Sequence, residues 1–312
     1  MKIKTVATIL AISTLTVLAG CSATSVEKLQ KSIQAIQGDT VKREQYPFKQ
    51  QMGKIESQYA GQGQFAVAKY ETPTAKPAEK FTVYYPNALN SNKKYPVIVF
   101  ANGTGISASR YPVVLEHFAS WGFIVVGNED QATNSGKSTN ASLAFLLSEN
   151  NNKNSPLYQK IDTNKIGLTG FSQGGASVFT AMADEAYRQH YKTAIAVSPV
   201  HEELGQKVNY PAYKLDAIKT PMMIIAGTKG NFEIKTVIPL DKMTEMYNKI
   251  NAPKLMARRI GADHDNMQFW ADGYRTAWFM YHLQNDQQAG QAFIGNNAEI
   301  ARNPLWQDVK IK

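Results

Sequence analysis

One serine of this chain stands in a pattern that is typical of nucleophilic catalysis. Ser172 is the centre of Gly170-Phe171-Ser172-Gln173-Gly174, which fits the pattern Gly-x-Ser-x-Gly. A strand-like apolar run precedes the pattern and a helical run follows it, so the serine is expected on a strained turn between strand and helix. Glycines are required beside it because side chains there would keep the two segments apart. The context therefore predicts a serine nucleophile.

A serine hydroxyl is a weak nucleophile at neutral pH and needs a base that removes its proton. His264 is predicted to be that base, because it follows the last predicted strand and completes the chain order serine, acid, histidine. His201 follows the carboxyl end of another strand and could line the site without being the base. The remaining histidines are interpreted as structural residues; they are His117, His190 and His282.

A carboxylate should hold the imidazole in the tautomer that accepts the serine proton. Glu233 is the only acid in the loop after the penultimate predicted strand and is predicted to be this residue. Asp241, one turn into the next predicted helix, is the alternative, although it is also typical of a helix cap. Asp263 and Asp265 rank below both, because neighbours of His264 on an extended loop point away from it.

Two backbone amides should stabilise the oxyanion that forms during acyl transfer. Gln173 supplies the first, and Thr104, in a glycine loop that follows the apolar run 97–100, is predicted to supply the second. The glycines of that loop could also simply end the strand. The sequence has no His-x-x-x-His pattern and no cysteine cluster, so neither a metal nor a cofactor is expected.

Strand-like and helical patterns alternate along the chain from residue 63 to residue 312, which is interpreted as one domain. The strands are expected at 65–68, 81–85, 95–100, 123–126, 166–169, 194–197, 222–226 and 255–260, and the helices at 112–121, 141–147, 176–187, 240–250 and 267–283. This alternation predicts an α/β fold with a mostly parallel sheet and helices on both faces, after an antiparallel first pair. The stretch between residues 197 and 222 is short, so no large lid is expected.

The amino terminus is predicted to carry a targeting signal. In residues 1–20, Lys2 and Lys4 precede an apolar run that is shorter than the roughly 20 residues of a membrane span, as in a signal peptide. Leu18-Ala19-Gly20-Cys21 resembles the lipobox of bacterial lipoproteins, which implies lipidation of Cys21, the only cysteine. Ser22 follows, and the resemblance then implies the outer membrane. Residues 21–62 are interpreted as the lipidated terminus and a spacer.

The formal net charge is +9, and removal of the signal peptide would lower it by two. A positive net charge could favour binding to anionic lipid surfaces or to acidic substrates. The basic residues are scattered and are not interleaved with aromatic residues, so nucleic-acid binding is not expected. The expected protein is a monomer that is attached to the membrane by its lipid.

From about Phe65 to Phe293 the chain resembles the α/β-hydrolase branch that contains dienelactone hydrolases, chlorophyllases and cutinase-like polyester hydrolases. The resemblance rests on residues 97–105, on residues 115–123, on the turn around Ser172 and on Asp263-His264. Members of this branch usually carry an aspartate where Gly230 stands here, and dienelactone hydrolases have cysteine in place of Ser172. The resemblance implies the α/β-hydrolase fold.

The predicted function is the hydrolysis of a carboxylic ester through an acyl-enzyme, in which Ser172 attacks, His264 transfers the proton and Glu233 orients the imidazole. The substrate would be a small, lipid or polymeric ester. An amide or thioester would use the same residues. The alternative function is a catalytically silent envelope lipoprotein that keeps the fold to bind lipid or a partner.

Overall fold

The computed structural model describes residues 53–90 and 92–312 of the chain. The predicted signal peptide, Cys21 and most of the predicted spacer lie outside the described residues and stay predictions. Within the described part, no helix has both the length and the apolar character that a membrane span requires.

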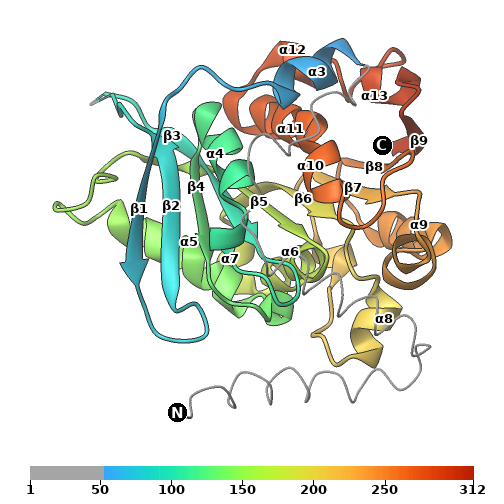
Figure 1. Ribbon diagram of the computed structural model, residues 1–312, viewed down its shortest axis with the longest axis horizontal. Coiled ribbons are helices and arrows are strands. Elements are labelled where there is room, and N and C mark those ends of the chain that lie inside the picture. Colours follow the sequence, from blue (N-terminus) through green and yellow to red (C-terminus); the bar gives the residue numbers. More distant parts are fainter. Residues whose placement is uncertain (1–52, 91) are drawn as a thin grey trace, which may run out of the picture.

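One nine-stranded sheet runs through the described body in the order β1-β2-β4-β3-β5-β6-β7-β8-β9 (Figure 1). Neighbouring strands are parallel from β4 to β8, whereas the pairs β1–β2, β2–β4 and β8–β9 are antiparallel. The strands are β1 (Val67–Pro73), β2 (Lys80–Pro86), β3 (Tyr95–Ala101), β4 (Ile124–Asn128), β5 (Ile161–Phe171), β6 (Tyr191–Val197), β7 (Met222–Gly227), β8 (Lys254–Arg259) and β9 (Trp306–Ile311). The predicted α/β class with a mostly parallel sheet is confirmed.

Both faces of the sheet are buried under helices, which explains the continuous apolar runs of the central strands. Along β3, Ile98 and Phe100 belong to one apolar cluster, and Val97 and Val99 belong to the other. This division follows from the alternation of side chains along a strand. The first cluster includes residues of α3 (Lys54–Ala60), α4 (Pro112–Ser120) and α11 (Asp272–Gln284), and the second includes residues of α5 (Lys137–Glu149), α6 (Gln173–Ala183) and α9 (Leu240–Lys249).

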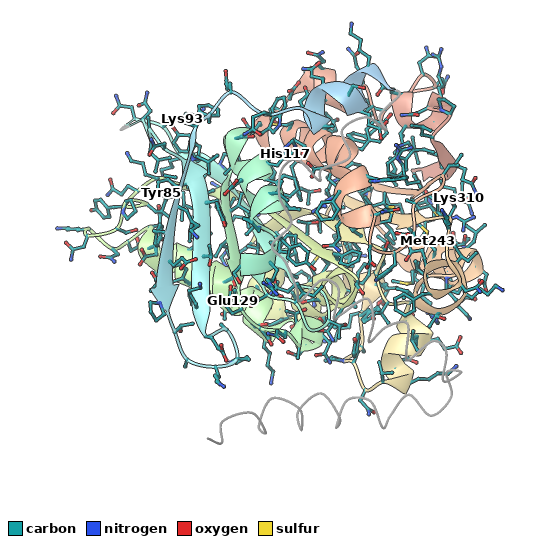
Figure 2. All side chains as sticks on the ribbon, viewed as in Figure 1. Tyr85, Lys93, His117, Glu129, Met243 and Lys310 are labelled. Atoms are coloured by element: carbon teal, nitrogen blue, oxygen red, sulfur yellow. The ribbon has the colours of Figure 1, made fainter. Side chains whose placement is uncertain are left out.

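The two edges of the sheet lie on opposite sides of the molecule. Figure 1 shows the edge strand β1 on one side and the edge strand β9 on the other, and Figure 2 labels Tyr85 of β2, the strand next to β1, and Lys310 of β9 on these two sides. Strand β9 was not expected from the sequence, because its run WQDVKI has no continuous apolar stretch. An edge strand does not need a continuous apolar stretch, because only part of it is buried: Trp306 is buried, while Ile311 is 40% exposed. Strand β9 therefore forms the edge of the sheet beside β8, although its sequence is only partly apolar.

Some predicted helices are divided. The helical pattern 176–187 forms α6 and α7 (Glu185–Arg188), and the pattern 267–283 forms α10 (Met267–Trp270) and α11. Between β6 and β7, the chain adds only the short α8 (Glu202–Lys207) and η5 (Leu215–Ala217). This stretch of residues 198–221 is called the β6–β7 insertion below.

Helix α3 lies in the segment that the sequence assigned to the spacer, so the folded body begins before residue 63. Glu299 accepts hydrogen bonds from the backbone amides of Ile55 (2.8 Å) and Glu56 (2.9 Å) at the start of the helix. The buried carboxylate of Glu56 accepts hydrogen bonds from Asn303 Nδ2 (2.7 Å) and Trp306 Nε1 (2.8 Å). These contacts join α3 to the last segments of the chain, which sequence periodicity could not indicate.

Glu56→Ala is expected to lower the free energy of unfolding by about 3 to 5 kcal/mol, because a buried ion pair loses one partner. The Arg259 Nε lies 3.9 Å from Glu56 Oε1, and both side chains are almost fully buried. Urea unfolding measures the difference. Glu185→Ala is the matched control, since the Glu185 side chain is 83% exposed and its pairing with Arg188 should matter little. Equal stability of the two variants would contradict the structural role of Glu56.

Candidate active site

Ser172 lies at a sharp turn between β5 and α6. Its backbone has φ 58° and ψ −116°, a conformation that L-residues rarely adopt and that stores strain. The glycines on either side are sterically required: a Cβ on Gly170 would lie 2.2 Å from the Gly174 carbonyl oxygen, and one on Gly174 would lie 2.0 Å from the Ala101 carbonyl oxygen. The strand-turn-helix expected around the serine is present.

The structure brings Ser172, His264 and Glu233 together. His264 Nε2 lies 2.9 Å from Ser172 Oγ, and His264 Nδ1 lies 2.6 Å from Glu233 Oε2. Ser172 and His264 are each 8% exposed and Glu233 is fully buried. Each residue follows the carboxyl end of a parallel strand, namely β5, β8 and β7, and these ends meet at one edge of the sheet. A proton can therefore pass from the hydroxyl to an imidazole that a carboxylate orients.

Glu233 lies in η6 (Phe232–Val237), a π-helical turn directly after the β7 loop. π-Helical turns are rare and occur frequently at functional sites. The second carboxylate oxygen, Oε1, accepts hydrogen bonds from Gly227 N (2.6 Å) and Ser198 Oγ (2.7 Å). Burial raises the pKa of Glu233, but the hydrogen bonds and the charge of His264 outweigh it, so the pKa lies below its ordinary value. The carboxylate is thus kept ionised.

Among the described residues, none of the other acids considered from the sequence is hydrogen-bonded to the His264 ring. Asp241 is an exposed residue in the first turn of α9. Asp263 accepts a hydrogen bond from the Asn266 amide (3.0 Å), and burial raises the pKa of the half-buried Asp265. Gly230 has φ 82°, in the left-handed region that favours glycine.

Ser198 is a residue of this site that the sequence did not indicate. It follows β6 with φ 43°, in the left-handed region, and is fully buried. Its amide donates to the Ile225 carbonyl (2.7 Å), which fixes the backbone against β7, and its hydroxyl donates to Glu233. The residue is recognisable only once β6 and β7 are known to be neighbours.

Ser198→Ala is expected to raise the pKa of Glu233, because one of the hydrogen bonds that lower it is lost. A carboxylate with a lowered pKa adds stability above its unfolded pKa, and this stability is lost as pH falls through the folded pKa. The variant should therefore be less stable near neutral pH by about 1 to 2 kcal/mol, with a smaller difference in acid. Urea unfolding across the acid range measures this. Ser198→Gly, which also relieves the positive φ, should show the same pH dependence; a difference that is constant with pH would contradict the role of the hydroxyl.

The two residues predicted to supply the oxyanion amides come from neighbouring strands. Gln173 begins α6, and Thr104 lies in the loop after β3. That loop is anchored by the buried Asn102, whose Nδ2 donates to the carbonyls of Asn128 (2.7 Å) and Asp130 (2.8 Å). The Gln173 side chain donates from Nε2 to the Tyr210 hydroxyl (3.0 Å). Burial raises the pKa of this hydroxyl, and hydrogen bonds from the side chains of Gln173 and Thr104 lower it. Tyr210 was not singled out from the sequence.

Two aromatic rings flank the imidazole. The ring centroid of His264 lies 4.7 Å from that of Phe171 and 4.9 Å from that of Phe232, which approaches edge-on. Such contacts restrict the rotation of the imidazole between its two polar partners.

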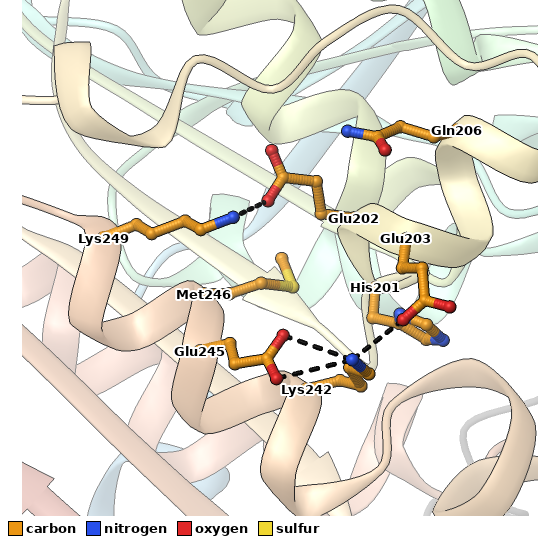
Figure 3. A pocket seen from close by; sticks show the side chains of 8 residues that line it. All are labelled: His201, Glu202, Glu203, Gln206, Lys242, Glu245, Met246 and Lys249. Atoms are coloured by element: carbon orange, nitrogen blue, oxygen red, sulfur yellow. Dashed lines mark hydrogen bonds and ion pairs between the residues drawn. The ribbon is translucent and has the colours of Figure 1, made fainter.

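The other histidines do not reach this site. His201 lines a separate cavity of about 240 Å³ between α8 and α9 (Figure 3). Its Nδ1 accepts a hydrogen bond from the Leu204 amide and so caps α8. The His117 side chain is fully buried, and its Nε2 lies 2.9 Å from Asp272 Oδ2. Burial lowers the pKa of His282 to about 4. Over the described ranges, no group of three or more histidine, cysteine, aspartate or glutamate side chains is arranged to hold a metal.

A family model described as PET hydrolase-like matches residues 49–306. None of the curated proteins compared with the chain matches it.

Proposed function

The chain belongs to the PET hydrolase-like family of ester-hydrolysing α/β-hydrolases, and we propose that it is a serine hydrolase that cleaves a carboxylic ester through an acyl-enzyme on Ser172. This family corresponds to the polyester-hydrolase branch that the sequence resembles. The observation that carries the proposal is the continuous hydrogen-bonded series Ser172, His264 and Glu233, with contacts of 2.9 and 2.6 Å.

In the first half-reaction, Ser172 Oγ forms a bond to the ester carbonyl carbon while its proton moves to His264 Nε2. The carbonyl electrons move to the oxygen, where the backbone amides of Gln173 and Thr104 are proposed to stabilise the negative charge. When the tetrahedral intermediate collapses, the ester C–O bond breaks, and the leaving alcohol takes the proton from His264. Ser172 then carries the acyl group.

In the second half-reaction, a water gives a proton to His264 and attacks the acyl carbon. Collapse of this intermediate breaks the bond to Ser172, returns the proton to its oxygen and releases the carboxylic acid. Glu233, buried and ionised, stabilises the imidazolium that forms in both halves. We propose a lipid or polymeric ester as substrate, because the β6–β7 insertion contributes only short elements above the carboxyl ends of the strands.

The proposal is tested by mass-spectrometric mapping of the adduct that a fluorophosphonate forms with the purified protein. We expect one adduct, on Ser172, that is absent from Ser172→Ala and suppressed in His264→Ala. Ser177→Ala is the matched control and should be labelled normally, since Ser177 lies further along α6 and its hydroxyl contacts Thr139 (2.8 Å). Folded wild-type protein without an adduct would favour the alternative of a silent, lipid-binding lipoprotein.

We further propose that Cys21 carries the lipid anchor and that the protein resides, as a monomer, on the outer membrane. The lipobox-like segment before Cys21 is the support for this proposal. Two or more acyl chains bind a membrane stably, because each buried methylene contributes about 0.8 kcal/mol. Metabolic labelling with a fatty acid, of wild type and Cys21→Ser, tests it: only the wild type should be labelled and sediment with outer membranes.

A further inference from the structure

Tyr210 connects the two segments that are proposed to form the oxyanion hole. Gln173 belongs to the turn after β5 and Thr104 to the loop after β3, and the side chains of both hydrogen-bond the hydroxyl of Tyr210. The Gln173 contact measures 3.0 Å, and the Gln173 side chain is itself buried, with 6% exposure. One hydroxyl thus fixes the side chains of two residues whose main-chain amides must be correctly spaced.

The insertion holds this hydroxyl firmly in place. The Tyr210 amide donates to the Gly205 carbonyl (2.8 Å), and its ring lies against Gly205, where a Cβ would stand 3.4 Å from Tyr210 Cδ2. The nearby Tyr213 hydroxyl donates to the Val200 carbonyl (2.9 Å), which joins the middle of the insertion to its first residues, directly after β6. Tyr210 is therefore attached to a folded segment and not to a free loop.

The phenol has the hydrogen-bonding capacity that this position needs. Its oxygen can accept two hydrogen bonds, one from Gln173 Nε2 and one from the Thr104 hydroxyl. Burial raises the pKa of Tyr210 by more than these two hydrogen bonds lower it, so the phenol keeps its own proton over the working pH range. A phenylalanine would keep the packing of the ring and lose both hydrogen bonds.

We propose that Tyr210 is a positioning residue of the oxyanion hole, which holds Gln173 and Thr104 at the spacing that the transition state requires. The inference rests on the proposed function. Oxyanion donors act by being preorganised, so a small displacement of either amide lowers the rate of acyl transfer more than it weakens substrate binding. The β6–β7 insertion would then contribute to catalysis without contacting the substrate.

The test compares Tyr210→Phe with wild type in kcat and KM for a chromogenic ester and in the inhibition constant of a trifluoromethyl ketone. Such a ketone forms a tetrahedral oxyanion adduct with the serine and so reports on the oxyanion hole. We expect kcat to fall about tenfold, less than the 10²- to 10³-fold loss of a direct donor. The ketone should bind more weakly by a similar factor, and KM should be almost unchanged. Tyr191→Phe is the matched control: it also removes a buried tyrosine hydroxyl, which donates to Asn140 Oδ1 (2.8 Å) away from the site.

A double-variant comparison separates positioning from general destabilisation. Thr104→Val should reproduce part of the loss of kcat, because it removes one of the two hydrogen bonds to Tyr210. The double variant Thr104→Val with Tyr210→Phe should lose little more than Tyr210→Phe alone, since the phenylalanine has already removed that contact. Additive losses, unchanged ketone binding, or a rise in KM alone would each overturn the inference. If the fluorophosphonate labels Ser172 normally and Tyr210→Phe behaves as wild type, only this inference fails. Absence of the adduct in folded wild type would overturn the proposed function and the inference together.

Discussion

Ser172→Ala is expected to lower kcat for an ester by about 10⁶-fold, because removal of the nucleophile abolishes the acyl-enzyme route. KM should change little, since the hydroxyl contributes mainly to the transition state. His264→Ala should cost about as much, and the double variant should lose no more than either single one, because the two residues act as a unit. Single-turnover assays with an activated ester, on protein purified free of host esterases, measure the three rates.

The matched control for this prediction is His201→Ala. His201 and His264 are equally buried, at 8% exposure each, but His201 caps α8 and lies outside the hydrogen-bonded series. Its loss should reduce stability and leave kcat nearly intact. If Ser172→Ala kept more than about one-thousandth of the wild-type rate, the residual catalysis would exceed what an oxyanion hole and binding supply alone, and the nucleophile would have to be another group.

The position of the proposed nucleophile is predictable from the sequence because the constraints on Ser172 are local. Ser172 needs a strand before it, a helix after it and glycines at its flanks, and all of these lie within one stretch of chain. The sheet is predictable for a similar reason, since buried parallel strands are apolar along their whole length. The local sequence pattern does not predict a segment whose structure depends on residues far away in the chain. Helix α3 has only Ile55 and Tyr59 as large apolar residues, spaced by four, and is held by Glu299 near the other end of the chain.

The remainder of the site could not be predicted, because it depends on which strands are neighbours. Ser198 is near Glu233 only because β6 and β7 pair, and Tyr210 reaches Gln173 only because the β6–β7 insertion folds back over β5. Neither residue belongs to a motif. Glu233 could be predicted in part. The sequence indicates the loop that carries it, but not the π-helical turn that directs its side chain to His264.

Glu233→Gln is expected to lower kcat by about 10⁴-fold while leaving the geometry of the site intact. A carboxylate only accepts from His264 Nδ1, which leaves Nε2 free to take the serine proton. An amide can instead donate to Nδ1 and so stabilise the tautomer that cannot act as a base. Asp241→Asn is the matched control for the acid that the sequence left as the alternative; it should keep full activity, because Asp241 is exposed on α9.

The pH dependence distinguishes this role from simple packing. Because the folded protein holds the pKa of Glu233 below its ordinary value, the ionised carboxylate stabilises the fold above its unfolded pKa, and the contribution disappears as pH falls through the folded pKa. Wild type and Glu233→Gln should therefore differ most in unfolding free energy near neutral pH and converge in acid. Glu233→Asp, which keeps the charge on a shorter side chain, should be more active than Glu233→Gln. The opposite order would contradict a role for the charge of Glu233. A loss of activity in Asp241→Asn alone would assign the orienting acid to Asp241, and the 2.6 Å contact between Glu233 and His264 would then serve only the stability of the fold.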